Sequence, residues 1–446
     1  MLCWADRKLR RLFKLCEKFM TIKTKIAVAL MLLPELTWGG EINQANTAWV
    51  LTSTALVLFM TIPGLSLFYG GLVRSKNVLS ILMQCFAITC LVSLLWLAGV
   101  YSFTFADGGP WQAFIGSGVK AFLPDMGTES LIGDIPETVY FMFQMTFAII
   151  TPALIVGAFA ERMKFSAMLW FSGLWLIVVY MPICHWIWGG GWLAAMGAKD
   201  FAGGIVIHVN AGVAALVSAL VLGPRRGFPT TAMPPHNMTM VVTGAGMLWF
   251  GWFGFNGGSA LTADGKAGMA IAVTHIAAAA GSLTWMTIEW LRFGKPSVLG
   301  IVTGMVAGLG TITPASGFVG PLGGLVIGVV AGAVCFYATQ YVKRSLKIDD
   351  SLDVFPVHGV GGCIGSILTG VFAAESFGGL GLNGVSIGDQ VAVQALAVAV
   401  TIAWSGLFSY GLLKIIDWLI GLRVNEDEEQ QGLDIVLHEE TGYHNL

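Results

Sequence analysis

The stretch GGIVIHVNAGVAALVSALVLG, from Gly203 to Gly223, decides the fold class of this chain. It has the length and the mostly apolar character of a helix that crosses a lipid bilayer. Its one ionisable side chain is His208. Because an imidazole at membrane depth is costly and usually functional, this stretch bears on function as well as on fold.

The composition of the whole chain is that of a membrane protein. Of 446 residues, 56% are hydrophobic and 11% are charged, whereas about 25% are charged in an average soluble domain. The net charge of -2 leaves no basic domain for binding nucleic acid. The seven cysteines show no CxxC spacing, and most of them lie in apolar segments. We therefore expect no disulfide, no metal site and no cofactor.

Runs of about 20 apolar residues occur eleven times. They predict an all-α integral membrane protein with eleven transmembrane helices, in a membrane domain over residues 41–422. The predicted spans begin near Thr47, Val78, Thr138, Ser166, Ala202, Met238, Ala267, Val298, Val319, Val357 and Gly388.

Basic residues in the loops predict the orientation, because short loops rich in Lys and Arg stay in the cytoplasm. Every second loop is basic. These loops hold Arg74, Lys76, Arg162, Lys164, Arg225, Arg226, Arg292, Lys295, Lys343, Arg344 and Lys347, and the intervening loops hold only Lys120, Lys199 and Lys266. The pattern predicts a mature N-terminus outside and a C-terminus in the cytoplasm.

Residues 1–40 form a separate N-terminal region. A basic segment from Arg7 to Lys25 precedes the short apolar run IAVALMLLPELTW and the small residues Gly39 and Gly40. This order is typical of a secretory signal peptide, and a start at Met20 would give that signal an ordinary length. A retained amphipathic or twelfth helix is the alternative.

Residues 423–446 form an acidic tail, RVNEDEEQQGLDIVLHEETGYHNL. Its composition is typical of a solvated, partly disordered end. The alternative is a docking segment on the cytoplasmic side.

The spans also indicate an internal repeat. Spans one to five and six to ten match in order, and an odd number of spans in each half inverts the second half. The first span ends in LFYGGLVRSKN and the sixth in GFNGGSALTAD, while the fifth contains IHVNAGV and the tenth VHGVGGC. The repeat pairs His208 with His358 near the membrane midplane. Two unrelated packing histidines remain the alternative.

The candidate pore helices carry no Asp, Glu, Lys or Arg at their centres. A permanent cation would therefore find no carboxylate to stabilise it inside the membrane. Aromatic side chains gather near the histidines instead, at Phe143, Phe147, Trp188, Trp252 and Phe255. The face of Trp188 can attract a cation, and the nearby hydroxyl of Ser259 can accept from an N–H donor. These residues predict an outer cation site, although such clusters also occur as interface belts or as core.

Several of these motifs carry a resemblance to a known family. From about Asn46 through the tail, the chain resembles the ammonium transporter family (Amt/Mep/Rh), in particular its bacterial members. The segments that carry the resemblance are FYGGLVRSKN, ALIVGAFAERMKF, IWGGGW, DFAGGIVIHVNAG, PHNM, GWFGFNGGS, GKPSVLG, TPASG, DDSLDVFPVHGVGG and GLRVNEDEEQQGLD.

The resemblance implies a homotrimer of eleven-helix subunits in the cell (inner) membrane, each with its own pore for ammonium or ammonia. It implies that Trp188, Ser259 and Phe143 recruit ammonium, and that Phe147 and Phe255 form a stacked gate. It further implies that the pore is lined by His208, His358 and Trp252, that Asp200 supports the recruitment site, and that the tail docks a PII-type signal protein.

The sequence thus predicts a transporter that recruits ammonium, deprotonates it and conducts ammonia, with or without a separately relayed proton. A membrane sensor that signals ammonium through its tail and a PII-type partner is the alternative. An enzyme is not expected, because neither histidine has a carboxylate or a His/Cys cluster nearby in sequence.

Overall fold

The computed structural model describes residues 41–444. The proposed signal region, with Met20, therefore lies outside the described residues. The chain divides into Met1–Glu41 and Ile42–Leu446, and all that follows concerns the second unit.

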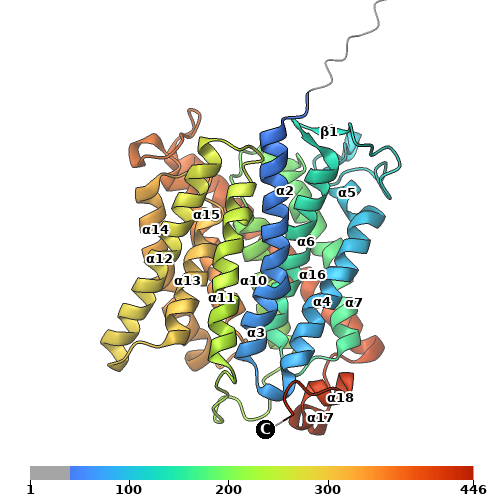
Figure 1. Cartoon of the computed structure of the whole chain (residues 1–446), viewed down its shortest axis with the longest axis vertical. Coiled ribbons are helices and arrows are strands. Elements are labelled where there is room, and N and C mark those ends of the chain that lie inside the picture. The colour runs from blue at the N-terminus through green and yellow to red at the C-terminus, as the bar shows by residue number, and fades with distance from the viewer. Residues whose placement is uncertain (1–40, 445–446) are drawn as a thin grey trace, which may run out of the picture. The chain divides into compact units, whose positions relative to one another are not determined.

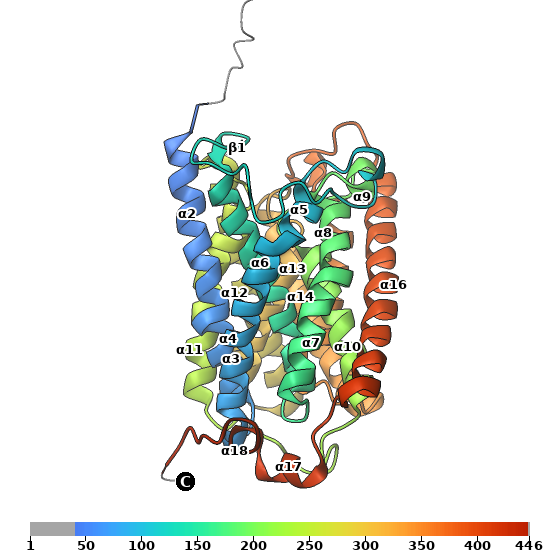
Figure 2. The same cartoon turned by 90° about the vertical axis from the view of Figure 1, so that its right-hand side faces the viewer.

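Helices account for nearly all of the regular structure of this unit (Figures 1 and 2). One short hairpin pairs β1 (Leu131–Ile132) with β2 (Ile135–Pro136). The first half contains α2 (Gln44–Phe59), α3 (Ser66–Leu72), α4 (Val78–Leu95), α5 (Tyr101–Phe105), α6 (Glu137–Phe159), α7 (Phe165–Trp175), α8 (Met181–Trp188), α9 (Trp192–Ala195) and α10 (Asn210–Leu222). The second half contains α11 (Met238–Trp252), α12 (Gly265–Phe293), α13 (Val298–Ile312), α14 (Pro321–Gln340) and α15 (Gly361–Phe372).

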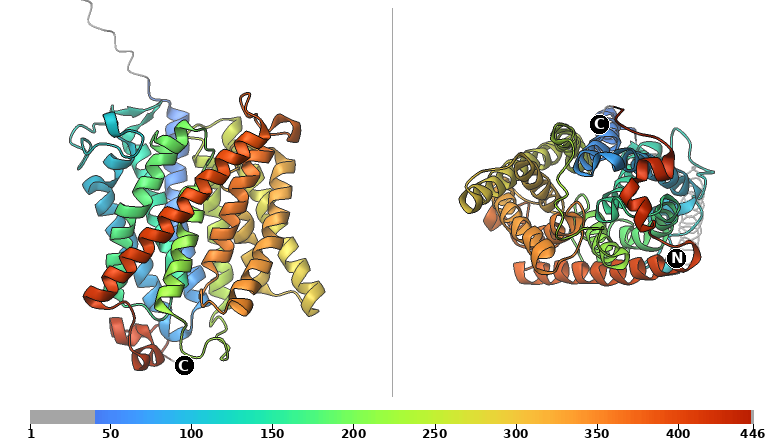
Figure 3. Two further views of the ribbon diagram at one scale, coloured as in Figure 1. Left: turned by 180° about the vertical axis from the view of Figure 1, so that it is seen from behind. Right: turned by 90° about the horizontal axis from the view of Figure 1, so that it is seen from below.

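Ten continuous helical segments of the described chain are long and apolar enough to cross a membrane, and α13 is a shorter apolar helix. Together they confirm the eleven predicted spans. The last of them, α16 (Ile387–Ile420), is 34 residues long and lies diagonally across the back of the bundle (Figure 3). The all-α membrane fold with its long final helix is therefore as predicted.

The two histidine helices show the inverted repeat most clearly. Each begins with a π-helical turn, η6 (Gly204–Val209) before α10 and η9 (Phe355–Val360) before α15. The two helices cross at glycines, since a Cβ atom on Gly212 would lie 2.3 Å from the Cα of Gly359. Larger residues there would push the helices apart, so the glycines allow the two histidines to approach each other.

The tail folds onto one end of the bundle, which we call the tail face (Figure 2). It forms α17 (Glu426–Gln431), with a capping box between Asn425 and Glu428, and α18 (Leu433–His438). The Asp434 carboxylate accepts the backbone N–H groups of Leu79 and Ser80 at 3.1 and 2.7 Å. The interpretation of the tail as partly disordered, drawn from composition, is thus wrong for these two helices. Composition did not reveal that the acidic side chains have partners on the bundle.

Glu429 shows most clearly how an acidic side chain of the tail is held in place. Its side chain is buried, and its carboxylate accepts the backbone N–H of Arg226 and a guanidinium N–H of Arg423, both at 2.7 Å. We expect Glu429→Gln to loosen the tail by about 1–3 kcal/mol, because one charge-assisted contact is lost. Limited proteolysis of the tail should be at least several-fold faster. Glu426→Gln, at an exposed position of the same helix, is the matched control, and equal cleavage rates in both variants would contradict the prediction.

Candidate functional site

The two histidines of the repeat meet at the centre of the bundle. The Nδ1 atoms of His208 and His358 lie 3.1 Å apart, and the rings are nearly parallel, with centroids 5.1 Å apart. Both side chains are buried. At this distance one Nδ1 must donate the hydrogen and the other must accept it. The structure therefore brings together two residues that are 150 positions apart in the sequence.

The space beside the histidines is narrow and apolar. It measures about 10 Å³, which is close to the room that a single water needs. Apart from the two histidines, Trp252 and Tyr69 are the lining residues with a polar side-chain atom, and both atoms are bonded to other residues. The remaining lining residues are Met60, Leu65, Phe68, Ile150, Leu154, Ile207, Leu248, Phe255 and Val306. A small neutral molecule fits this passage, whereas a hydrated cation does not.

Aromatic rings lie next to the narrow space on the side away from the tail. The rings of Phe147 and Phe255 have centroids 4.6 Å apart, but their planes make an angle of 62°. The expectation of a stacked gate is therefore wrong in its geometry, because the rings meet edge to face, an arrangement that the aromatic quadrupole favours. Phe143 and Trp188 both contact Phe147, at 4.9 and 5.8 Å.

Trp188 is the last residue of α8 and is anchored through its polar edge. Its indole N–H donates to the backbone carbonyl of Asp200 at 2.8 Å, and its side chain is half-buried. Ser259 donates its hydroxyl hydrogen to the carbonyl of Phe255 at 2.8 Å, so its lone pairs remain able to accept. Its neighbour Gly258 fits tightly against the ring of Phe143. Phe143 and Trp188 therefore both adjoin Phe147, and Ser259 follows a glycine that packs against Phe143.

Asp200 holds the start of the first histidine helix. Its carboxylate accepts the four backbone N–H groups of residues 203–206 at 2.6–3.0 Å. Burial raises the pKa of this carboxyl group, and the four donors oppose that rise. These N–H groups have no partner within a helix, so Asp200 supplies the cap that they require.

Sequence reasoning missed the counterpart of Asp200 in the second half. Asp350 accepts the backbone N–H of Phe355 at 2.7 Å, at the start of the helix that carries His358. Burial, followed by the charge of Asp353, raises the pKa of Asp350 to about 6. Asp350 precedes His358 by eight residues, as Asp200 precedes His208. This equal spacing was the signal that could have found it.

A second residue missed from the sequence is Thr313. Its hydroxyl accepts the indole N–H of Trp252 at 2.9 Å. Trp252 in turn lies almost parallel to the ring of His208, with centroids 5.5 Å apart. The threonine therefore fixes the ring against which the histidine rests.

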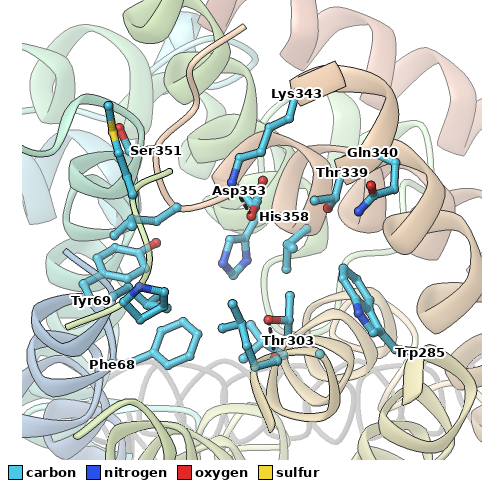
Figure 4. A pocket seen from close by; sticks show the side chains of 18 of the residues that line it. Phe68, Tyr69, Trp285, Thr303, Thr339, Gln340, Lys343, Ser351, Asp353 and His358 are labelled. Carbon is cyan, nitrogen blue, oxygen red and sulfur yellow. Dashed lines mark hydrogen bonds and ion pairs between the residues drawn. The ribbon is translucent and has the colours of Figure 1, made fainter. Parts of the chain in front are cut away.

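Towards the tail face lies a larger cavity of about 290 Å³, which shares Phe68, Tyr69 and His358 with the wall of the narrow space (Figure 4). Asp353 and Lys343 form an ion pair of 2.8 Å beside it. Polar side chains such as Thr303 and Gln340 complete the lining. The change from an apolar passage to a polar cavity occurs at His358.

Buried ion pairs fix the loops around this cavity. Arg225 holds Asp349 through two bonds of 2.9 Å and contacts Glu161 at 3.3 Å, while Arg74 binds the same Glu161. Burial alone would raise the pKa of Asp349, but Arg225 lowers it below its ordinary value. The network ties four loops of the tail face together.

A multi-pass membrane bundle with a narrow apolar space, flanked by aromatic rings and lined by two imidazoles, is typical of a channel or transporter for a small solute. A model of the Ammonium Transporter Family matches residues 48–443. The chain belongs to this family, and it is accordingly a transporter and not an enzyme.

Relatives along the whole chain agree with this assignment. The chain is 45% identical over 428 residues to an ammonium transporter of Aquifex aeolicus (strain VF5), covering 94% of this chain and 98% of the relative. It is 46% identical over 407 residues to an ammonium transporter of Bacillus subtilis (strain 168), covering 90% and 99%.

Solved structures share the fold. Mep2 of Candida albicans superposes with a TM-score of 0.80 at 36% identity, covering 87% of this chain and 88% of that one. A protein described as a sensor Amt protein superposes with a TM-score of 0.82 at 31% identity, covering 88% and 98%.

Proposed function

We propose that this chain recruits ammonium at the mouth formed by Trp188, Ser259 and Phe143, removes one proton, and conducts ammonia past His208 and His358. The single observation that carries this proposal is the passage of about 10 Å³ with a pair of touching imidazoles. Ammonia is small, neutral and able to form hydrogen bonds, and it therefore matches both the size and the chemistry of this space.

Recruitment requires a site that attracts a cation without holding it too tightly. The half-buried ring of Trp188 attracts ammonium through its quadrupole, and the hydroxyl of Ser259 accepts one of its N–H groups. Phe143 closes the side of the site. The proposed site uses no carboxylate. Because no full negative charge holds the ion there, it can leave again.

Deprotonation then separates ammonium from potassium. The two ions have similar size and equal charge, but only ammonium can lose a proton and cross the apolar passage as a neutral molecule. At the gate of Phe147 and Phe255 one N–H bond breaks, and its electron pair stays on nitrogen. The Nε2 atom of His208, buried and without a hydrogen-bond partner in the described part of the chain, is an available proton acceptor.

The histidine pair offers a route for that proton. The shared hydrogen between the two Nδ1 atoms can move from one ring to the other, since an imidazole both donates and accepts near neutral pH. The proton and ammonia then rejoin in the polar cavity below His358. Trp252, held by Thr313, keeps the first ring in place throughout.

Trp188→Leu tests the recruiting site. A cation–π contact is worth about 0.5–2 kcal/mol, so the apparent affinity for ammonium should fall by about 2- to 30-fold while the maximal rate changes less. Uptake measured over a range of ammonium concentrations gives both values. Trp186→Leu, two residues away, is the matched control, and an unchanged apparent affinity in the Trp188 variant would exclude this tryptophan as a recruiter.

The transport mechanism is tested by current across a lipid bilayer that contains the purified protein. An ammonium step should produce a current that a potassium step does not. No current, with uptake still visible as a pH change in vesicles, would mean that ammonia alone passes and that the histidines do not relay the proton. Equal currents for both ions would overturn the proposal.

The same proposal assigns a role to each part of the chain and an orientation in the membrane. Residues 1–40 serve as a signal region, residues 41–422 form the transport domain of a homotrimer in the cell inner membrane, and residues 423–446 regulate it. The mature N-terminus then lies outside and the tail face in the cytoplasm, where a PII-type protein docks. The ordered helices α17 and α18 support a docking role for this end.

A sensor is the second candidate, and the similarity to the sensor Amt protein favours keeping it. A sensor would bind its partner in proportion to ammonium without needing flux. Partner binding that depends on ammonium in a variant without transport would support this alternative.

A further inference from the structure

His185 lies buried in α8, three residues before Trp188. Its Nδ1 atom lies 2.7 Å from the backbone carbonyl oxygen of Thr104, and its Nε2 atom lies 2.7 Å from that of Gln112. Thr104 belongs to α5, and Gln112 belongs to the loop 106–118 that follows α5. The imidazole ring therefore joins a helix end and a loop to the helix that carries Trp188.

The two carbonyl oxygens decide how this ring is protonated. A carbonyl oxygen can only accept a hydrogen bond, and a neutral imidazole has one N–H group, so a neutral ring would leave a lone pair facing an oxygen at 2.7 Å. Only the imidazolium donates from both nitrogens. Both distances are shorter than about 2.9 Å, the usual value for a neutral N–H···O bond, and are typical of an ionised donor. Two donated hydrogen bonds therefore imply a positive charge on the ring.

A buried cation needs compensation, and here the backbone supplies it. Thr104 lies one residue before the end of the helical segment Ser75–Phe105. Carbonyl groups at a helix end lack partners within the helix, and the helix dipole favours a positive charge there. Among the described residues no carboxylate forms an ion pair with His185. The charge on His185 is therefore stabilised by backbone dipoles and is not neutralised.

Gln112 extends the contact to the turn that follows Trp188. Its side-chain amide donates to the backbone carbonyl of Gly189 at 2.8 Å, and its side-chain carbonyl accepts the N–H of Gly108 at 2.7 Å. The turn consists of three glycines, residues 189–191, which have no side chains of their own to fix it. The position of the turn therefore depends on contacts from the loop 106–118.

Close packing makes this dependence strict. A Cβ atom on Gly189 would lie 2.0 Å from the carbonyl oxygen of Thr104, so the turn rests directly on the end of α5. Trp188 immediately precedes the turn, and its indole N–H is held by the carbonyl of Asp200. The backbone beside Trp188 is thus fixed from the loop, and its ring is fixed from Asp200.

We propose that His185 is an imidazolium and that, together with Gln112, it positions Trp188 in the recruiting site. The inference rests on the recruiting role of Trp188 in the proposed function and adds two positioning residues to that site. Both residues act on ammonium only through the ring of Trp188. They therefore affect the apparent affinity for ammonium more than the maximal rate of transport.

Gln112→Met tests the positioning role, because methionine keeps the length of the side chain and removes both of its hydrogen bonds. The apparent affinity for ammonium should fall by about 2- to 10-fold, as expected for the loss of one or two hydrogen bonds, while the maximal rate changes less. Uptake over a range of ammonium concentrations gives both values. Trp111→Leu, at an exposed position of the same loop, is the matched control and should change neither value.

The double variant of Gln112→Met with Trp188→Leu shows whether the effect passes through the tryptophan. The double variant should bind ammonium no more weakly than Trp188→Leu alone, because losses that act through one ring are not additive. Additive losses would overturn the inference and leave the proposed function intact, as would an unchanged affinity in Gln112→Met beside a weakened one in Trp188→Leu. An unchanged affinity in Trp188→Leu itself would overturn the recruiting site, and this inference with it.

Nitrogen-15 NMR of the unmodified protein in lipid, with labelled histidine, tests the charge on His185. At about pH 8, where a solvated imidazole is mostly neutral, one histidine should show two protonated ring nitrogens and a through-space contact with a carbonyl carbon of carbon-13 glutamine. This signal should be absent from His185→Gln. If every histidine of the unmodified protein showed a neutral ring, the proposed charge would be wrong, whether or not the variant folds.

Discussion

Replacing His208 and His358 together by leucine will lower the ammonium-driven current by at least about 100-fold while the protein still folds. Leucine is close to histidine in volume, so the change removes the two imidazoles without emptying the passage. Positioned proton transfer contributes about 10²–10⁴ to a rate. Because the two Nδ1 atoms are only 3.1 Å apart, the loss of both rings removes the whole relay.

The double alanine variant separates chemistry from steric block. Alanine leaves more room, so ammonia should still pass by diffusion, and uptake seen as a pH change should exceed that of the leucine variant. The current should remain absent in both. Thermal unfolding and the size of the purified oligomer serve as checks on folding. A current that excludes potassium at its normal size in either double variant would refute the relay.

Asp200→Ala will cost both stability and transport. The carboxylate accepts four backbone N–H groups, and each buried group left unpaired costs about 1–3 kcal/mol. We expect a loss of about 4 kcal/mol or more in the free energy of unfolding. Transport should fall at least about tenfold, because Trp188 is anchored on the carbonyl of the same residue and His208 follows on the helix that it caps.

Two variants sharpen this second prediction. Asp200→Asn keeps one carbonyl oxygen in place, so it should restore part of the stability. Asp107→Ala removes an exposed carboxylate from the first half that accepts only the N–H of Gly109, and it should change neither property. If Asp200→Ala matched the Asp107 control in both measurements, Asp200 would have no supporting role.

Much of the fold could be predicted from the sequence because a bilayer imposes a simple rule of length and polarity. Each predicted span begins within three residues of an observed helix, and even the 15-residue α13 was found by its apolar composition. The pairing of His208 with His358 was also accessible, since the inverted repeat relates their positions without any knowledge of contacts.

Other features depend on geometry that no local pattern encodes. The angle between Phe147 and Phe255 follows from how two helices place their rings. Asp350 caps a helix from just outside a span, so a pattern of charges inside the spans does not reveal it.

The narrowness of the passage has a consequence for the membrane potential of a cell. A membrane under voltage stores about 2.3 kcal/mol per 100 mV for each elementary charge, and any pore open to potassium would discharge it. A space of about 10 Å³ between the histidines and the aromatic rings admits no hydrated ion. A cell can therefore keep many copies of this protein in its membrane without a leak of potassium.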